Sequence, residues 1–507
     1  MLRVALVSVY PGTSRSEGGR HWLSSARLAA FAVAQRPEWH VRLRAFPEDI
    51  PPSQVAAALG DEGFDVVGLP AYIWTRQWSR DVARELVRHN RSPLVVVGGP
   101  DTRAMYYRDW PEETVFVLGQ GERPFVELGR RRENDTSYNG RSLEVTGQPA
   151  FSRSCHRSRV LDCAVPSKDM KRLDHGVELY GPHFEQLLEG DDDDGTFTWY
   201  ETARGCIYSC SFCGHNTLPF FATFDLSFVE QEIKNMRARG FRELSIVDPI
   251  LGGRPRRGKE ILRLFTKTAP EIRLQGYMRP EFLDEEFISL LADATIAELM
   301  LGLQTTNPSV PQHVRGNNFA KIMRYVPSLA DRGVPWRAEL IVGLPGDDMK
   351  GLRESFRFTI DELRPSTIRA YHLTAIPETQ MFGLLNRAED EHWIKANGDL
   401  LVTSSNSFNE DELVSMLAYA GATMSRYEYL KRSGSGETFT FDDVDRAVNQ
   451  LLSFAKGKAP ETFISLDIDR GVRLWQMAEE AMSAQASQSL LAARRTRLTL
   501  DQVADKT

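Results

Sequence analysis

The sequence predicts an α/β protein with three structured parts. Apolar, strand-like runs alternate with helical periodicity over residues 1–135, which is typical of a doubly wound, Rossmann-like parallel sheet. The alternation resumes after a polar linker at 136–195 and continues through residues 196–380, which predicts a partial barrel of six βα units. Residues 381–507 carry mainly helical periodicity and predict a helical C-terminal extension.

The first part is expected to contain five parallel strands with helices between them. The strands are predicted at residues 3–9, 41–46, 64–69, 94–97 and 115–118, and the helices at 21–35, 52–59, 77–89, 102–109 and from 123 onward. In such sheets, ligands bind outside the carboxyl ends of the strands. Glycines there let a bulky ligand approach the backbone closely.

The residues that follow the third, fourth and fifth strands fit a ligand site of this kind. They are Tyr72, Trp74, Gly98, Gly99, Pro100, Gly119, Gly121 and Glu122. A dinucleotide site would instead need a Gly-x-Gly-x-x-Gly motif after the first strand. That strand is followed by Tyr10-Pro11-Gly12-Thr13, so an NAD site is not expected.

Composition narrows the class of protein further. The net charge is −7 over 507 residues, so no basic field indicates nucleic-acid or anionic-membrane binding. No continuous apolar run is long enough to span a membrane, and the N-terminus has no signal-peptide pattern. The five cysteines do not form a disulfide framework, so a reducing cytoplasm is the expected compartment.

The second part places polar residues at the ends of its six predicted strands. These strands are expected at residues 196–203, 243–247, 272–276, 297–303, 337–342 and 367–373, with helices at 228–239, 284–292 and 349–363. The working groups of parallel βα barrels lie at the carboxyl ends of the strands. The C-terminal helices are expected at 410–429 and 472–495, and the Arg254–Arg257 stretch is interpreted as a solvated turn.

The most specific motif directly follows the first of these strands. Cys206, Cys210 and Cys213 supply three thiolates from one short loop with Cys-x3-Cys-x2-Cys spacing. A [4Fe–4S] cluster normally takes four cysteine ligands, so three leave one iron open to another ligand. A zinc site is the alternative, and His215 keeps it open, although no second Cys/His pair stands at knuckle spacing.

The cysteine motif resembles that of the radical S-adenosylmethionine (SAM) superfamily, in which SAM binds the open iron and is cleaved. The glycine motifs upstream resemble the cobalamin-binding domain found ahead of many such barrels. Gln120 departs from the glutamate that this domain often carries, and the Asp-x-His-x-x-Gly motif that supplies a histidine to cobalt is absent. The resemblance therefore implies a corrin without a histidine ligand, with Trp74 near its lower face.

The resemblance also implies contacts with the three cofactors. Cys206, Cys210 and Cys213 would hold the cluster, and the strand-end residues 72–122 named above would contact cobalamin. SAM contacts are implied for Phe212, Asp248, Arg279, Gln304, Glu339 and Leu373. Catalytic residues stay unassigned; Tyr277, His215 and His372 are candidates for contacting the substrate or moving protons.

The implied reaction is cobalamin-dependent methyl transfer to an unactivated carbon, or to phosphorus, of a small-molecule or peptide natural product, as in antibiotic biosynthesis. In such enzymes cluster-bound SAM and methylcobalamin act together, and an external flavodoxin- or ferredoxin-type reductant supplies electrons. One alternative is a ring contraction, cyclisation or rearrangement without net methyl transfer. Another is a corrinoid-binding sensor or carrier. Substrate identity and oligomeric state stay open.

Overall fold

The computed structural model describes most of the chain as two compact units. The described residues are 1–10, 23–88, 92–102, 109–138, 159–163, 177–181, 184–187, 196–217, 221–433, 439–454 and 461–487. One unit comprises Met1–Ile207 and Leu218–Leu274, and the other Tyr208–Thr217 and Gln275–Thr507.

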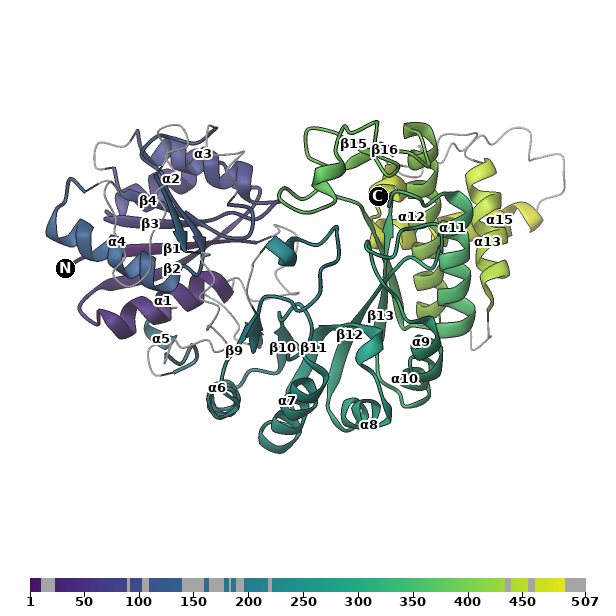
Figure 1. Cartoon of the computed structure of the whole chain (residues 1–507), viewed down its shortest axis with the longest axis horizontal. Helices are drawn as coiled ribbons and strands as arrows, with labels where there is room; N and C mark the ends of the chain where they lie inside the picture. Colours follow the sequence, from purple (N-terminus) through teal and green to yellow (C-terminus); the bar gives the residue numbers. More distant parts are fainter. Residues whose placement is uncertain are drawn as a thin grey trace. The chain divides into compact units, whose positions relative to one another are not determined.

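The N-terminal sheet confirms the predicted doubly wound architecture. Its six strands are all parallel and run in the order β2-β1-β3-β4-β5-β6. The strands are β1 (Arg3–Tyr10), β2 (His40–Pro47), β3 (Val66–Pro70), β4 (Leu94–Gly98), β5 (Val115–Gly119) and β6 (Arg159–Cys163). Helices α1 (Leu23–Gln35) and α4 (Glu122–Asn134) cover one face, and α2 (Pro52–Asp61) and α3 (Arg76–Leu86) cover the other (Figure 1).

One strand of this sheet lies in the stretch predicted as linker. The strand β6 pairs in parallel with β5, so the sheet extends one strand beyond the predicted five. Only five residues long, this segment is too short to show a clear strand period. The helix predicted at 102–109 lies largely outside the described residues.

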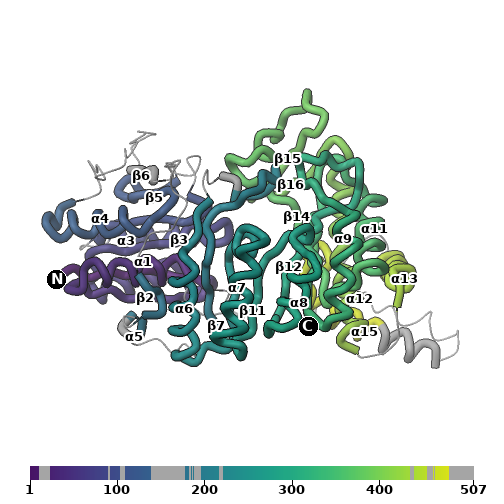
Figure 2. The backbone as a smooth tube through the Cα atoms, turned by 60° about the horizontal axis from the view of Figure 1, so that its bottom comes forward, coloured from purple at the N-terminus to yellow at the C-terminus, as the bar shows by residue number. Residues whose placement is uncertain are grey.

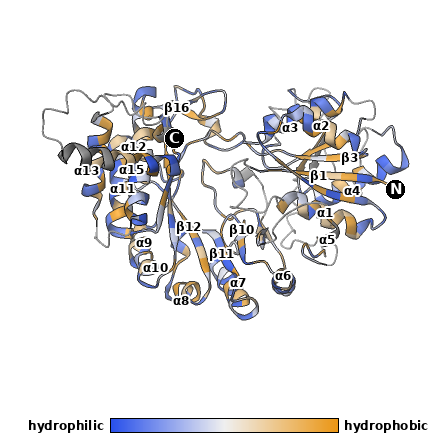
Figure 3. Ribbon diagram, turned by 180° about the vertical axis from the view of Figure 1, so that it is seen from behind, coloured by the Kyte–Doolittle hydropathy of each residue, from blue (hydrophilic) through white to orange (hydrophobic). Residues whose placement is uncertain are grey.

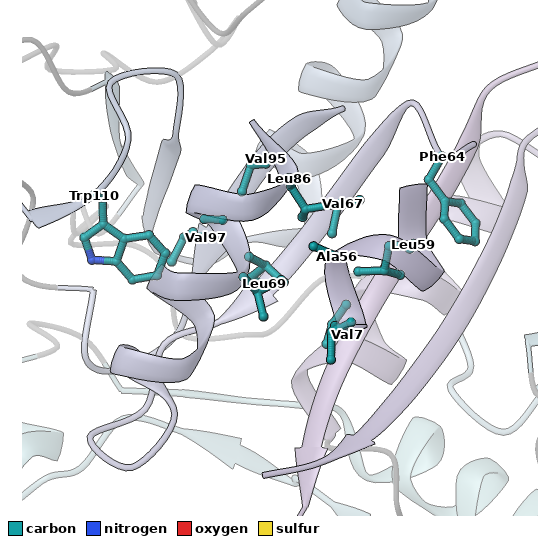
Figure 4. Close-up of a cluster of buried hydrophobic side chains, with 14 of the residues drawn as sticks. Val7, Ala56, Leu59, Phe64, Val67, Leu69, Leu86, Val95, Val97 and Trp110 are labelled. Carbon is teal, nitrogen blue, oxygen red and sulfur yellow. The ribbon is translucent and has the colours of Figure 1, made fainter. Parts of the chain in front are cut away.

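A hydrophobic core fills the space between this sheet and the helices α2 and α3. Val7, Val67 and Val97 from the strands pack with Leu59 from α2, and each is at most 3% exposed (Figure 4). Trp110 and Phe116 close one end in an edge-to-face contact, with ring centroids 5.5 Å apart. Burial of each large apolar side chain stabilises the folded domain by about 1.5–3 kcal/mol. This packing holds the strands, and therefore their carboxyl ends, in place.

The second sheet follows the predicted βα order and does not close. Its strands run in the order β14-β13-β12-β11-β10-β7, so β7 and β14 are the two ends. They are β7 (Phe197–Tyr200), β10 (Glu243–Ile246), β11 (Arg273–Met278), β12 (Ile296–Gln304), β13 (Trp336–Val342) and β14 (Thr367–His372). The predicted first strand is interrupted, because residues after Tyr200 turn away and form β8 (Ala203–Arg204), which pairs with β9 (Ala222–Thr223).

Helices follow the strands of this sheet along the chain. They are α6 (Leu226–Ala238), α7 (Pro255–Thr268), α8 (Glu285–Asp293), α9 (Phe319–Tyr325), α10 (Pro327–Asp331) and α11 (Met349–Arg357), which continues as the π-helical turn η4 (Phe358–Leu363). Several are amphipathic, with hydrophobic and hydrophilic stripes visible on α7 (Figure 3).

The interpretation of Arg254–Arg257 as a solvated turn is correct for the exposure of Arg254 and Arg256 but wrong for the backbone, which is helical from Pro255 onward. Pro255 begins α7, as its fixed φ favours at a first helical turn. Arg257 points inward, where its guanidinium donates to the carbonyl oxygens of Thr202 (3.3 Å) and Phe224 (2.5 Å).

The C-terminal part is mainly helical, as predicted, but begins with a short two-stranded sheet. Strands β15 (Ile394–Ala396) and β16 (Val402–Ser405) pair antiparallel (Figure 2). The helices are α12 (Glu410–Arg432), α13 (Phe441–Phe454), α14 (Glu461–Ile464) and α15 (Ile468–Ser487). No helix among the described residues combines the length and apolarity needed to cross a membrane.

The long helix α12 covers the free edge of the second sheet. A capping box formed by Asn409 and Glu412 starts it. Along the helix, the Sδ atom of Met424 accepts the backbone N–H of Ala370 in β14 at 2.7 Å. Covering the edge strand in this way satisfies a backbone donor that would otherwise be open to pairing with another chain.

Candidate cofactor site

The three predicted cluster cysteines lie in one loop between β8 and the 3-10 turn η2 (Gly214–Thr217). Cys206, Cys210 and Cys213 are all half-buried, and none of the three forms a disulfide. The Cys213 N–H donates to the Cys210 carbonyl oxygen at 3.1 Å, which tightens the second half of the loop. The left-handed φ of +84° at Gly205, just before the first cysteine, is one that a side chain would strain.

A buried carboxylate holds the start of this loop. Asp248 is completely buried and accepts four hydrogen bonds: from the Thr202 N–H (2.6 Å), the Thr202 hydroxyl (2.5 Å), the Ala203 N–H (2.9 Å) and the Gly252 N–H (2.9 Å). Burial raises its pKa to about 6, against the effect of these donors. The contact with SAM predicted for Asp248 stays a prediction; in the structure both of its oxygens accept hydrogen bonds from within the protein.

Two arginines flank the second cysteine. The Arg279 guanidinium lies 3.7 Å from the Cys210 Sγ atom, and that of Arg315 lies 3.9 Å from it. Burial, together with the neighbouring Arg279 charge, lowers the pKa of Arg315. The thiolate is the form of cysteine that binds iron, and these two guanidinium groups would offset part of the negative charge of a thiolate-bound cluster. Arg315 was not singled out by the sequence, because it lies in a loop segment without a strand-end signal.

Arg279, which was predicted to pair with the SAM carboxylate, has several partners within the protein. Its guanidinium is 6% exposed, stacks 4.1 Å from the Tyr208 ring centre, and donates to the Glu281 carboxylate at 3.1 and 3.3 Å and to the Gly316 carbonyl at 2.8 Å. The expected bidentate pairing with the SAM carboxylate is therefore not supported, because Glu281 already takes that geometry.

Gln304 ends β12 in a conformation that ordinary residues rarely adopt. Its φ is +68°, and the strand register shifts between Gly302 and Gln304. Strained backbone of this kind concentrates at functional sites. The loop that follows is held by Asp347, whose carboxylate accepts from the Asn307 side-chain amide at 2.8 Å and from the Thr305 hydroxyl at 3.5 Å.

Glu339 lies in the middle of β13 within a polar group from neighbouring strands. Its carboxylate accepts from the Tyr371 hydroxyl at 3.3 Å and lies 3.5 Å from the Arg337 guanidinium. Only 8% of Glu339 is exposed, and burial raises its pKa. Tyr277 and Tyr371 are 40% and 46% exposed, so both rings are available to a ligand.

The end of β14 is occupied by structural hydrogen bonds. Leu373 is 3% exposed, donates its N–H to the Val342 carbonyl, and accepts from the Val402 N–H, both at 2.9 Å. The predicted SAM contact of Leu373 is thus not available through its backbone. The ring of His372 contacts the Val402 carbonyl at 2.6 Å, and burial lowers its pKa, as in a structural histidine.

The strand ends of the N-terminal sheet carry a tight turn and exposed aromatic surface. Gly99 has a φ of +133°, and a Cβ atom there would lie 2.5 Å from the Ala71 carbonyl oxygen. The Tyr72 and Trp74 rings stack with centroids 5.0 Å apart, and Trp74 is 58% exposed. Exposed apolar surface at the ligand edge of a doubly wound sheet indicates a binding site.

Glu122 was predicted to contact cobalamin, but its carboxylate points into the protein. It is 4% exposed at the first position of α4 and accepts from the Arg204 guanidinium at 2.9 and 3.4 Å. The predicted contact with cobalamin stays a prediction. Sequence periodicity could not pair Glu122 with Arg204, because 82 residues separate them.

Replacing Asp347 by asparagine is expected to flatten the dependence of stability on pH. Burial raises the Asp347 pKa to about 6, whereas an unfolded aspartate titrates at about 3.9. Between these values the folded chain binds more protons than the unfolded chain, so this group makes the protein less stable as pH rises from about 4 to about 6.

Denaturant unfolding at pH 5 and pH 7 measures this effect. Asp347→Asn should lose less stability over that interval than the wild type, and the exposed control Asp331→Asn should behave as the wild type. Identical pH slopes in Asp347→Asn and wild type would contradict the buried, proton-binding state.

Comparison with known proteins agrees with both halves of this description. The B12 binding domain family matches residues 19–129, and the radical SAM superfamily matches residues 200–359. The 2-(S-pantetheinyl)-carbapenam-3-carboxylate methyltransferase of Streptantibioticus cattleyicolor is 26% identical over 64% of this chain and 48% of its own length. The cobalamin-dependent radical SAM methyltransferase TokK of Streptomyces tokunonensis is 25% identical over 62% of this chain and 48% of its own.

The fold has a solved counterpart over the whole chain. The cobalamin-dependent S-adenosylmethionine radical enzyme OxsB, with aqua-cobalamin and SAM bound, superposes with a TM-score of 0.63 at 12% identity, covering 100% of this chain and 83% of that one. The chain spans about half the length of the two curated relatives. Its residues 19–129 match the B12 binding domain family, and its residues 200–359 match the radical SAM superfamily, in that order along one chain.

The residues present fit the cofactors of this class, which are a [4Fe–4S] cluster, SAM and cobalamin. Three cysteines in one loop, without disulfides and with two guanidinium groups beside Cys210, suit a cluster that keeps one iron open. Within the described residues, His, Cys, Asp and Glu side chains do not gather into a ready-made site for a single metal ion. The exposed Trp74 ring and the glycine turn at Gly99 suit a large planar ligand.

Proposed function

We propose that this protein is a cobalamin-dependent radical SAM methyltransferase that modifies an unactivated carbon, or phosphorus, of a small-molecule or peptide natural product. The observation that supports this proposal most strongly is the presence of two sites in one chain. One is the loop of three cysteines next to Arg279 and Arg315, and the other is the glycine-rich edge of the N-terminal sheet with its exposed aromatic rings. Both curated relatives are named methyltransferases, and one is named for a carbapenam substrate. These names support a role in antibiotic biosynthesis.

The bound cofactors would supply the difficult chemistry, namely reductive cleavage of SAM at the cluster and methyl transfer through the cobalt. The protein's own residues hold and orient them. Arg279 and Arg315 place positive charge beside the Cys210 sulfur, while Asp248 fixes the strand end that leads into the loop. An external one-electron reductant of the flavodoxin or ferredoxin type completes the proposed system.

On the SAM side, three of the predicted residues keep their proposed contacts. Phe212, half-buried between Ser211 and Cys213, presents its backbone within the cluster loop. The Ser211 carbonyl accepts from the Met381 N–H at 2.9 Å, which fixes this part of the loop. Gln304 and Glu339 would contribute polar contacts from neighbouring strands. Tyr277 and Tyr371, exposed beside Glu339, are the proposed substrate contacts.

On the cobalamin side, the stacked pair Tyr72 and Trp74 would face the corrin. Trp74 offers the larger exposed surface, and the Tyr72 hydroxyl is held by the Ser24 hydroxyl at 3.0 Å. The turns at Gly98, Gly99 and Pro100 and at Gly119 and Gly121 would let the ring approach the backbone.

The decisive experiment uses the full chain, reconstituted anaerobically with iron and sulfide and supplied with SAM labelled in its methyl group. With hydroxocobalamin and a reductant present, we expect S-adenosylhomocysteine to form in a cobalamin-dependent way. The label should enter cobalamin and, when a candidate methyl acceptor is added, a product that gains one methylene unit. A product of unchanged mass without S-adenosylhomocysteine would support rearrangement. Cobalamin binding without any SAM consumption would support a sensor or carrier. Either result would overturn the proposal.

A further inference from the structure

A buried ion pair joins the cobalamin-binding domain to the start of the cluster loop. Glu122 directly follows the glycine turn at Gly119 and Gly121, and Arg204 stands two residues before Cys206. The Arg204 Nη2 atom lies 2.9 Å from the Glu122 Oε1 atom, and Nη1 lies 3.4 Å from Oε2. This two-pronged geometry fixes the guanidinium in orientation as well as in position.

The pair is part of a larger buried network. Arg204 also donates to the Glu201 carboxylate, at 2.5 and 3.1 Å. Glu201 in turn lies 3.6 Å from Arg27 on helix α1. The side chains are only 19% (Arg204), 10% (Glu201), 5% (Arg27) and 5% (Glu122) exposed, and Arg27 also lies 4.0 Å from the fully buried Glu232, so two cations and three anions share a site largely withdrawn from water.

Burial makes these charges depend on one another. A charge withdrawn from water is stabilised only by well-placed partners, and removal of one partner leaves the other uncompensated. Arg204 therefore keeps its place only while Glu122 and Glu201 keep theirs. Because Glu122 is the first residue after the proposed corrin-facing turn, a ligand that orders this turn also orders Glu122 and, through it, Arg204.

We propose that Glu122 and Arg204 are positioning residues that transmit occupancy of the cobalamin site to the loop carrying the cluster cysteines. Corrin binding at the Gly119–Gly121 turn would restrain residues 201–207 before any iron is bound. Neither side chain needs to touch a cofactor. The inference rests on the cobalamin-binding domain and not on the proposed methyl transfer, and its test requires no turnover.

Hydrogen–deuterium exchange of the full chain, with and without hydroxocobalamin, tests this coupling. In the wild type, hydroxocobalamin is expected to slow exchange in peptides covering residues 119–125 and also in those covering 201–207. In Glu122→Gln, hydroxocobalamin should still slow exchange at residues 119–125. Its protection of residues 201–207 should be about tenfold smaller than in the wild type, which is the size of a typical coupling between contacting residues.

The matched control is Glu127→Gln on the same helix. Glu127 pairs with Arg130 and Arg131 near the surface, at 2.9 and 3.0 Å, so its replacement removes the same charge without touching the network. It should behave as the wild type. Equal protection of residues 201–207 in Glu122→Gln and wild type would overturn the inference.

A second variant covers the case in which Glu122→Gln does not fold. Arg204→Lys keeps the charge between the two carboxylates but lacks the planar fork, so part of the transmitted protection should be lost. Full transmission in Arg204→Lys would contradict the proposed role. If the wild type itself does not bind hydroxocobalamin, both the proposed coupling and the corrin site are refuted. SAM cleavage at the cluster, measured without cobalamin, would then show whether the proposed radical SAM activity remains.

Discussion

Replacing Cys210 by alanine is expected to abolish SAM cleavage and to leave the protein without an intact [4Fe–4S] cluster. Cys210 is the cysteine that Arg279 and Arg315 approach most closely, at 3.7 and 3.9 Å. With the thiol gone, only two cysteines of the triad remain, and two guanidinium groups lose the sulfur atom that they contact. The cluster should therefore fail to assemble, and the loop should lose stability as well.

Iron and sulfide content, visible absorbance and the yield of SAM cleavage products after anaerobic reconstitution measure this result. Cys163→Ala, which removes a cysteine of β6 outside the triad, is the control and should retain the wild-type cluster. Wild-type levels of SAM cleavage by Cys210→Ala would contradict the assignment of the triad.

Replacing Gly99 by alanine is expected to produce the second largest effect, a loss of both stability and cobalamin binding. At a φ of +133°, any side chain strains the backbone, and the new Cβ atom would lie 2.5 Å from the Ala71 carbonyl oxygen. Such strain costs about 1–3 kcal/mol, and the clash adds to it. Because Ala71 immediately precedes Tyr72, relief of the clash would also displace the stacked pair of Tyr72 and Trp74.

A glycine outside the cobalamin-binding domain provides the control. A Cβ atom at the exposed Gly398 would meet nothing within 4 Å, so Gly398→Ala should bind hydroxocobalamin with near wild-type affinity. Denaturant unfolding and hydroxocobalamin titration of both variants give the comparison. Equal affinity and stability of Gly99→Ala and Gly398→Ala would show that the turn at Gly99 does not shape the corrin site.

Three residues predicted to contact a cofactor already form hydrogen bonds within the protein, for one shared physical reason. Asp248, Glu122 and Arg279 all stand at strand or helix ends, where the sequence places cofactor contacts. In the structure, each is instead occupied by a protein partner: Asp248 by backbone donors of the β7–β8 segment, Glu122 by Arg204, and Arg279 by Glu281. A strand-end position indicates that a residue is near the site, but not whether its hydrogen-bonding capacity is already used.

The sequence by itself determined the class of site and the order of the elements. The cysteine spacing and the alternation of strands and helices are local properties, written in residues a few positions apart, so they are legible without tertiary contacts. The short strand β6 was not predicted, because its strand structure depends on pairing with β5 and its own sequence pattern does not indicate a strand.

Only the tertiary structure decided which polar side chains stay available to ligands. Arg315 reaches Cys210 across 105 residues and Glu122 reaches Arg204 across 82, distances over which sequence periodicity carries no information. Burial then makes each of these pairings nearly obligatory, because an isolated charge withdrawn from water is too costly to keep. Thus local spacing set the chemistry that the chain can perform, and packing assigned its charged residues to holding the site or to facing a ligand.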